Sequence, residues 1–283
     1  TPSYNQGKYL PDLIQSVKSQ TYRPIEHIII DGASTDSTLA ILQDYSANPD
    51  GIKVNWVSET DRGQGNAVNK GFALAKGDVV GWINSDDSYF HRGVFERVVF
   101  EFKKHPEVDI IHGNLALISS KNLIGIIWCI PEFNYERMYV DGKVAQATVF
   151  FRRQVIEENQ LRENFLSLDY EFWLRLGKKY RFMHINDILA CDRDQPERIT
   201  RVNSTSLKES HITAKNENPP QISEFHRLWF KVSNVPIRAF YRFVGLLMFL
   251  QLYGRSDYFA FNPQVDSKIA FIKRQLFGRI GKL

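Results

Sequence analysis

Three short apolar segments in the first ninety residues are each followed by aspartate, which restricts the folds open to this chain. The segments span 25–30, 54–57 and 79–83. The acids after them are Asp31, Asp61, Asp86 and Asp87. Between these segments, apolar residues recur every three or four positions, as in amphipathic helices. Strands that alternate with helices are typical of a parallel α/β sheet, whose ligands bind at the carboxyl ends of the strands. We therefore predict that these acids line one site.

Adjacent carboxylates such as Asp86 and Asp87 repel each other, and one of the two is pushed toward its neutral form. Oxygen ligands of this kind suit a hard divalent cation. An Asp-Asp pair is also a common turn that closes a strand. From the pair alone, both readings remain open.

The second half of the chain is less regular. It predicts helices near 94–102 and 168–176, and strands near 109–112, 147–151, 182–185 and 188–191. The run Asn-Glu-Asn-Pro-Pro at 216–220 is a strong structure breaker and marks the expected domain boundary. We expect a catalytic domain over 1–216, with halves at 1–115 and 116–216, and a helical C-terminal extension over 221–283. We also expect that a β-strand precedes Thr1.

Charge is unevenly distributed along the chain, although its formal net charge is only +4. Residues 227–283 hold ten Lys and Arg against two Asp, a net charge of +8, which leaves −4 for the first 226 residues. The apolar segment 245–252 is too short to span a bilayer, so a helix lying on a membrane surface is one interpretation. Packing on the catalytic domain or on a partner subunit is the other. Nucleic-acid binding is not expected, because no binding motif accompanies the charge.

Six stretches carry a resemblance to a known family, and they occur in that family's order. They are 1–5 (TPSYN), 31–36 (DGASTD), 61–63 (DRG), 84–87 (NSDD), 146–153 (QATVFFRR) and 169–175 (DYEFWLR). The set resembles the inverting family 2 glycosyltransferases, which transfer sugars from nucleotide donors and have the GT-A fold, a Rossmann-like α/β architecture. The resemblance covers about residues 1–200.

The resemblance implies roles for individual residues. Asp31 would accept a hydrogen bond from a uracil or thymine ring, Arg62 would reach the diphosphate, and Asp169 would be the general base. Glu171 is a second choice for the base. Asp87 would ligate Mn²⁺ or Mg²⁺, which stabilises the departing diphosphate. The remaining implied nucleotide contacts are Thr1, Pro2, Tyr4, Asp61, Asn66 and Asp86.

Two regions depart from the family pattern or stay open. Gln195 stands where many relatives place a histidine, so Arg193 and Arg198 are the expected substitutes at the diphosphate. Trp173 could line the acceptor pocket, or it could belong to the core. His184 and His211 are expected to be structural or exposed.

The expected activity is transfer of a sugar, most readily from a UDP-sugar, to a hydroxyl of a glycan or lipid-linked glycan. A nucleotide-sugar-binding protein without transfer activity is an alternative, and a nucleotidyltransferase is another. The absence of paired cysteines favours the cytoplasm, with the inner face of the membrane as a possible site of attachment. A homodimer stays open.

Overall fold

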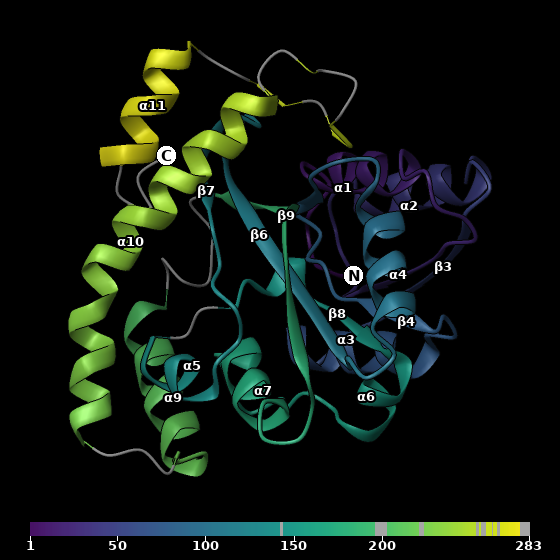
Figure 1. Ribbon diagram of the computed structural model, residues 1–283. Coiled ribbons are helices and arrows are strands. Elements are labelled where there is room, and N and C mark those ends of the chain that lie inside the picture. Colours follow the sequence, from purple (N-terminus) through teal and green to yellow (C-terminus); the bar gives the residue numbers. More distant parts are fainter. Residues whose placement is uncertain are drawn as a thin grey trace.

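Two β-sheets, with helices packed around them, make up the part of the chain that the structure describes (Figure 1). The structure is a computed structural model. It describes residues 1–283 except 142–143, 196–202, 221–223, 253–254, 256–258, 262, 265–266 and 278–283. It confirms the predicted α/β class.

The first sheet is parallel and contains three strands in the order β1-β2-β3. Its strands are β1 (Pro2–Ser3), β2 (Glu26–Asp31) and β3 (Lys53–Ser58). Asp31 lies opposite both Ser3 and Ser58 in the register, so the three strands end at the same edge. The predicted strands at 25–30 and 54–57 are confirmed.

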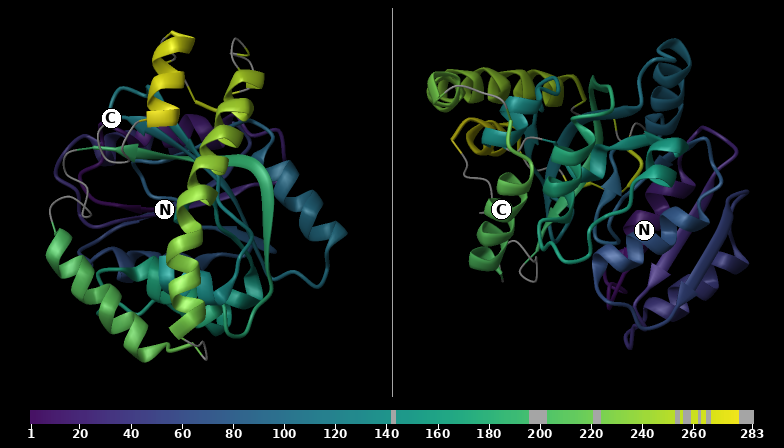
Figure 2. Two further views of the ribbon diagram at one scale, coloured as in Figure 1. Left: turned by 60° about the vertical axis from the view of Figure 1, so that its left-hand side comes forward. Right: turned by 90° about the horizontal axis from the view of Figure 1, so that it is seen from below.

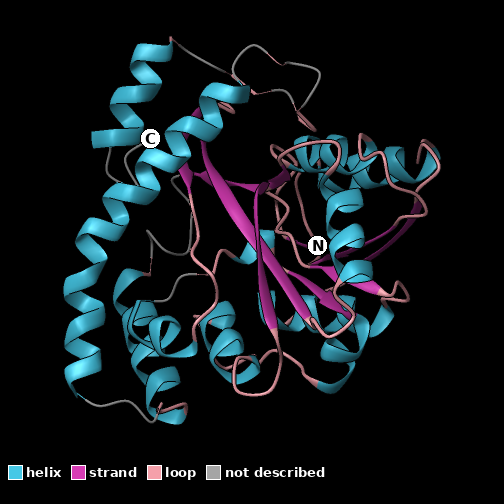
Figure 3. Cartoon of the chain, viewed as in Figure 1, coloured by secondary structure: helices cyan, strands magenta, loops and turns pink. Residues whose placement is uncertain are grey.

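The second sheet is mixed and has the order β4-β8-β6-β9-β5, with β7 also paired to β6. Its centre is the parallel pair of the long strands β6 and β9, which run side by side in Figure 3. The two strands predicted near 182–185 and 188–191 are one strand, because the β6 pairing continues through a register shift at Gly113 and Asn114. The strands are β4 (Val79–Gly81), β5 (Ser88–Tyr89), β6 (Ile110–Ser119), β7 (Ile124–Trp128), β8 (Phe150–Arg152) and β9 (Phe182–Asp194).

Helices connect and cover the strands. Helix α1 includes Leu10, Leu13, Ile14 and Val17 on its buried side, as their spacing predicted. The predicted break at 216–220 is confirmed, since α9 ends at Glu217. The helices are α1 (Leu10–Lys18), α2 (Thr38–Ala47), α3 (Gln64–Leu74), α4 (Val94–Lys104), α5 (Tyr135–Asp141), α6 (Arg153–Glu158), α7 (Leu168–Leu176), α9 (Ser204–Glu217), α10 (Glu224–Leu252) and α11 (Lys268–Phe277), with a short 3-10 helix η1 (Gln146–Thr148).

An apolar cavity of about 860 Å³ separates the two sheets. Residues of β2 line one side and residues 79–83 line the other, with Thr1 at the edge. Asp86, Asp87 and Asp169 are not among the lining residues, so this cavity is distinct from the predicted site. The expectation of a strand before Thr1 stays a prediction.

The C-terminal helices cover one face of the second sheet, and α10 forms an outer layer along one side of the molecule (Figure 2). Phe249 of α10 and Phe271 of α11 stack with ring centroids 3.6 Å apart, and both are fully buried. The side chain of Gln275 pairs with the N–H and the C=O of Ile127 on β7, at 2.7 and 2.9 Å. No helix in the described part of the chain is long and apolar enough to cross a membrane.

The core contains a histidine that gives a testable pH dependence. His112 on β6 is fully buried, and neither of its ring nitrogens has a hydrogen-bond partner in the described part of the chain. Burial is the main cause that lowers the pKa of His112 to about 3, and the charge of neighbouring His184 contributes to the same shift. Because the unfolded chain binds this proton near pH 6.5, the neutral ring's full contribution to stability is present above that pH. It is lost progressively as the pH falls toward the folded-state value.

We therefore expect His112→Leu to weaken the pH dependence of the unfolding free energy. The parent should lose up to about 1.4 kcal/mol per pH unit through this group below pH 6.5, whereas the variant should not. Urea unfolding at pH 7.5 and pH 5.5 measures the difference. His105→Leu, at a partly exposed histidine, is the matched control. Equal pH dependence in the His112 variant and the parent would contradict the assignment.

Candidate functional site

Asp86 and Asp87 lie just beyond β4 and are held by the end of β9. Asp87 is 4% exposed, and one of its carboxylate oxygens accepts the backbone N–H of Arg193 at 3.1 Å. The side chain of Gln195 donates to Asp86 Oδ2 at 2.7 Å. β9 reaches these acids because its partner β5 begins at Ser88, directly after them. The pair is therefore a fixed part of the sheet edge and not a solvated turn.

Asn84 links this edge to two other elements. Its Oδ1 accepts the Gln64 side chain of α3 at 2.8 Å, and its Nδ2 donates to Gln146 of η1 at 3.0 Å. Gln146 in turn donates to the carbonyl of Trp82 at 2.5 Å. This bond occupies the Trp82 carbonyl, and it explains why β4 stops at Gly81 although residues up to 83 fit a strand. The amide network thus fixes where the acidic pair begins.

A small aromatic and acidic wall lies at the end of the first sheet. The ring of Tyr4 is 62% exposed, so the alternative that it belongs to the core is wrong. A β-carbon added to Gly32 would lie 2.9 Å from Asp61 Oδ2 and 3.3 Å from Tyr4 Cδ2. Gly32 therefore lets the Tyr4 ring and the Asp61 carboxylate approach each other. Such a pair offers a stacking face and a hydrogen-bond acceptor, as a planar base requires.

Asp31, which was expected to contact the base, is fully buried in this structure. Its carboxylate accepts the Ser34 N–H at 2.9 Å, the Ser34 hydroxyl at 2.5 Å and the Ser58 hydroxyl at 2.7 Å. These bonds close the turn after β2. These bonds hold Asp31 in place behind the wall, and its contact with a base stays a prediction. Pro2 is the first residue of β1 and is buried. Thr1 precedes the strand and is half-buried.

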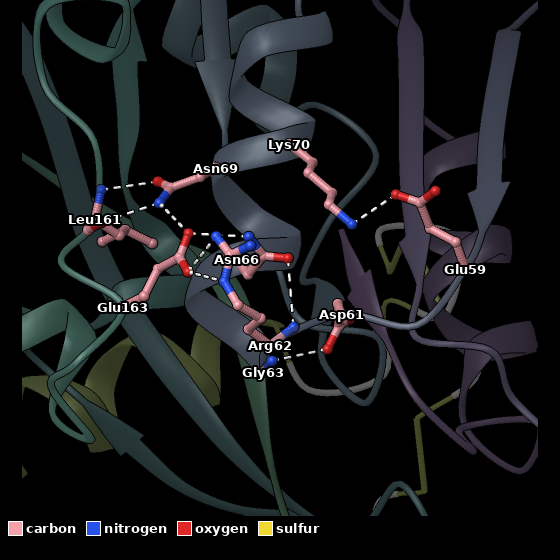
Figure 4. Close-up of polar contacts among 9 residues, drawn as sticks. All are labelled: Glu59, Asp61, Arg62, Gly63, Asn66, Asn69, Lys70, Leu161 and Glu163. Carbon is pink, nitrogen blue, oxygen red and sulfur yellow. Dashed lines mark hydrogen bonds and ion pairs between the residues drawn. The ribbon is translucent and has the colours of Figure 1, made fainter.

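Arg62 and Asn66 meet Glu163, a residue that the sequence did not single out (Figure 4). Arg62 donates to Glu163 Oε2 at 2.9 Å, and Asn66 donates to Glu163 Oε1 at 3.0 Å. Hydrogen bonding from Asn66 is the largest cause that lowers the pKa of Glu163, followed by the contribution of Arg62. The Arg62 side chain is 77% exposed, so it can exchange this partner for another anion.

Asp169 lies in the first turn of α7 and is partly exposed. Burial of the carboxyl raises its pKa, and the N–H of Tyr170, at 2.8 Å, and nearby His211 oppose this shift. Burial has the larger effect, so the net shift of the Asp169 pKa is upward. The start of α7 touches α3, because a β-carbon on Gly65 would lie 2.9 Å from a Leu168 methyl group. Gly65 contacts Leu168 beside Asp169, and Gln64 bonds Asn84 near the acidic pair. Helix α3 therefore links Asp169 to the elements that hold the pair.

Glu171 and Trp173 lie away from solvent on the same helix. Glu171 is fully buried and pairs with Arg175 at 3.0 Å, so it has a structural partner and does not compete as the base. Trp173 is 1% exposed and stacks on Phe151 at 5.8 Å. The acceptor-pocket assignment for Trp173 is therefore replaced by a core role. Trp173 points inward because α7 packs on Phe151 of β8. Glu171 lies about 200° away around the helix, where it pairs with Arg162 and Arg175.

Arg193 does not face a diphosphate. It is 1% exposed, and its guanidinium donates to Asp12 at 3.0 Å, to the Asp86 carbonyl at 2.8 Å and to Asn122. The sequence-based assignment to the diphosphate is corrected, because these bonds join α1, the acidic edge and the β6–β7 turn. Arg198, the other expected substitute, lies outside the described residues.

The donor set fits a divalent cation that is shared with a substrate. No cluster of three or more His, Cys, Asp or Glu able to hold a metal occurs among the described residues. Mg²⁺ is commonly bound through one or two carboxylates, with water and substrate phosphates completing its shell. Asp87 and Asp86 can supply those carboxylates, whereas a cage built from protein alone is not available here.

Several residues of the site carry no signal in a single sequence. Glu163, Gln64, Gln146 and His211 reach the site through contacts between distant segments. His211 packs against Tyr170 with ring centroids 4.6 Å apart, so it is next to the expected base rather than purely structural. Gly65, in the first turn of α3, permits the close approach of Leu168.

The parallel and the mixed sheet, with acids at the carboxyl ends of their strands, have the GT-A architecture. The model of glycosyl transferase family 2 matches residues 1–125, a span that holds four of the six sequence stretches. This match confirms the resemblance over that part of the chain.

Curated relatives are glycosyltransferases by name. Chondroitin synthase from Escherichia coli is 29% identical over 221 residues, which are 76% of this chain and 30% of that protein. A PGL/p-HBAD biosynthesis glycosyltransferase from Mycobacterium bovis is 27% identical over 191 residues, 65% of this chain and 72% of the relative. The chain thus spans less than a third of the chondroitin synthase.

Solved structures share the fold. TarS residues 1–349 from S. aureus, in complex with UDP-GlcNAc, gives a TM-score of 0.61 at 20% identity, covering 80% of this chain and 67% of that one. The mannosyltransferase PcManGT from Pyrobaculum calidifontis, in complex with GDP-Man and Mn²⁺, gives 0.55 at 15% identity, covering 90% of this chain and 85% of the other. At these identities the likeness shows the fold alone.

Proposed function

We propose that the chain is an inverting glycosyltransferase that moves a sugar from a UDP-sugar to a hydroxyl of a glycan or lipid-linked glycan. The observation that carries the proposal is that three groups are each connected to the start of α3, through chain continuity at Asp61, through the Gln64–Asn84 hydrogen bond and through the approach of Gly65 to Leu168. They are the Tyr4–Asp61 wall, the Asp86–Asp87 pair and Asp169. Residues 1–216 would form the catalytic unit, and 221–283 its helical extension.

The wall suits the donor's base and ribose. Tyr4 offers an exposed ring for stacking, and Asp61 offers a carboxylate whose other oxygen already accepts the Gly63 N–H at 2.8 Å. Asn66 is 6% exposed, and its side-chain oxygen accepts the backbone N–H of Arg62 at 3.4 Å. Its side-chain nitrogen donates to Glu163, which is the ion-pair partner of Arg62. An incoming diphosphate would compete with Glu163 for Arg62. One neighbour of this fold is in complex with UDP-GlcNAc and another with GDP-Man, so the choice of uridine rests on the sequence resemblance.

The reaction would be a single displacement. Asp169 removes the proton from the acceptor hydroxyl as its oxygen attacks the anomeric carbon and the bond to the diphosphate breaks. A raised pKa strengthens Asp169 as a base, because a carboxylate with a higher pKa accepts a proton more readily. Asp87 and Asp86 would hold Mn²⁺ or Mg²⁺, which supplies positive charge beside the diphosphate.

A sugar-nucleotide-binding protein without transfer activity is the main alternative. It would keep the wall and the acidic pair, but it would have no use for a base with a raised pKa. The raised pKa of Asp169 at the junction of α7 and α3 therefore favours the enzyme.

A panel of nucleotide sugars, with and without Mn²⁺, tests the proposal. We expect UDP and one UDP-sugar to raise the melting temperature, and the same sugar to be released or transferred slowly. Gly32→Ala should weaken nucleotide binding by about tenfold or more, because its new methyl group would press on Asp61 and Tyr4. Gly71→Ala is the matched control, since its β-carbon meets its nearest neighbour at an ordinary 3.7 Å. Nucleotide binding without any turnover would contradict the enzyme assignment. Unchanged nucleotide binding by Gly32→Ala would show that the Tyr4–Asp61 wall is not part of the nucleotide site.

A further inference from the structure

Exposed apolar side chains of α10 fall into two groups, at 228–232 and 240–250, which we together call the outer stripe. Its members are between 38% and 62% exposed, and they recur mostly at three- or four-residue intervals. The outer stripe consists of Leu228, Trp229, Val232, Phe240, Phe243, Leu247 and Leu250. From Leu228 to Leu250 a helix is about 33 Å long. A patch of this length and composition on one helix exceeds the scattered apolar residues of an ordinary surface.

The outer stripe is not the packing face of α10. Gly245, Leu246 and Phe249 are buried against β7 and α11, and a β-carbon on Gly245 would lie 2.8 Å from the Ile127 carbonyl. The helix therefore already uses its other side to bind the sheet. Figures 1 and 2 show α10 as an outermost element of the molecule. The stripe has to face either solvent or something outside this chain.

Charge indicates what that partner is. After Glu224, the α10 sequence contains no acidic residue and four basic ones, at positions 227, 231, 238 and 242. Residues 227–283 together carry +8, while the first 226 carry −4. A second copy would bring one +8 surface against another, at an electrostatic cost. An anionic surface would be attracted to it.

Helix α11 adds the same chemistry. Ile269 is 66% exposed and Phe277 is 80% exposed, and Lys268 and Lys273 are exposed on the same helix. Basic residues combined with Trp, Phe and Leu on a separate face are typical of helices that lie in the headgroup region of a membrane. Each Lys or Arg near an anionic bilayer adds to the attraction, which salt weakens.

We propose that the outer stripe of α10 docks the protein flat on an anionic lipid surface. The apolar side chains would insert below the headgroups, while the basic residues of 227–283 draw the helix to the surface. Docking of this kind needs no membrane-spanning helix. It does not depend on the proposed sugar transfer, so each can fail without the other.

Vesicle flotation tests the proposal with the full chain. We expect binding to vesicles with 30% phosphatidylglycerol, at least about tenfold weaker binding to pure phosphatidylcholine, and release in 0.5 M salt. Trp229→Ser/Phe243→Ser should lower the partition coefficient by about tenfold or more. Leu74→Ser/Phe100→Ser, at residues 47% and 55% exposed on other helices, is the matched control and should bind like the parent. Thermal unfolding confirms that all variants fold.

Three results would overturn the proposal. Equal binding of parent and stripe variant would show that the stripe is not the docking surface. Failure of the parent to float with anionic vesicles would show that lipid is not the partner. If light scattering without vesicles shows a dimer that the stripe variant alone abolishes, while the parent does not float, the stripe is an interface between copies of this chain.

Discussion

Asp169→Asn should lower turnover by about 10²- to 10⁴-fold while leaving nucleotide binding intact. An amide cannot accept the proton of the acceptor hydroxyl, and loss of a positioned general base typically has this effect. The donor wall and the acidic pair are built from other residues, so the affinity for UDP should stay within about twofold. Initial rates with the preferred donor, together with calorimetric titration of UDP, measure the two quantities.

The same substitution should stabilise the fold. Because burial raises the pKa of Asp169, the folded chain holds this proton more tightly than the unfolded chain. The group's contribution is therefore most favourable below the unfolded value near pH 3.9, and it declines as the pH rises through the folded value. A neutral asparagine removes this cost at pH 7, so the melting temperature should rise. In the parent, the rate should fall as the pH drops through the same folded value.

Asp50→Asn is the matched control for that experiment. It makes the identical chemical change at a carboxylate that is 63% exposed and pairs with Lys18 far along the chain from α7. Its rate and melting temperature should stay close to those of the parent. If the turnover of Asp169→Asn stays within twofold of the parent, another residue must be the general base.

Arg193→Met should cost about 2–4 kcal/mol of unfolding free energy. The guanidinium is buried and joins Asp12 of α1, the Asp86 carbonyl and Asn122 of the β6–β7 turn. Methionine fills part of the volume but removes the donors from the Asp86 carbonyl and from Asn122 Oδ1, while Asp12 Oδ2 keeps the Asn122 amide at 3.1 Å. Asp12 is 31% exposed and can recover water, which keeps the loss below that of a fully buried pair. Urea unfolding at pH 7.5 measures it.

Arg153→Met is the control for Arg193. Arg153 is 40% exposed and pairs with Glu157, itself 59% exposed, at 3.5 Å on the surface of α6, where such a pair contributes about 0.5 kcal/mol. A similar loss in both variants would mean that the Arg193 bonds add no more than a surface pair. If Arg193→Met keeps the stability of the parent but loses nucleotide binding, the assignment of Arg193 to the diphosphate would be restored.

Most of the fold was predictable because it depends on local patterns. The helical spacing of Leu10, Leu13, Ile14 and Val17 and the apolar run of β2 specify their elements within a few residues of chain. Helix α5 and strand β7 were not predicted, since short apolar segments of this kind gain their form from the neighbours on which they pack. The merging of two predicted strands into β9 has the same cause.

The same distinction between local pattern and tertiary contact applies to the site. By itself, the sequence determined that acids follow successive strands, because the carboxyl ends of parallel strands share one edge. It also placed Asp86 and Asp87 after the third apolar segment, but the structure puts the strand of that segment, β4, in the second sheet. Only the tertiary structure decided which side chains face outward. It buried Arg193 against Asp12, 181 residues away, and it brought Glu163 to Arg62 across 101 residues. Such partners depend on the path of the whole chain. The type of a residue limits which bonds it can form, but it does not specify which distant segment will lie next to it.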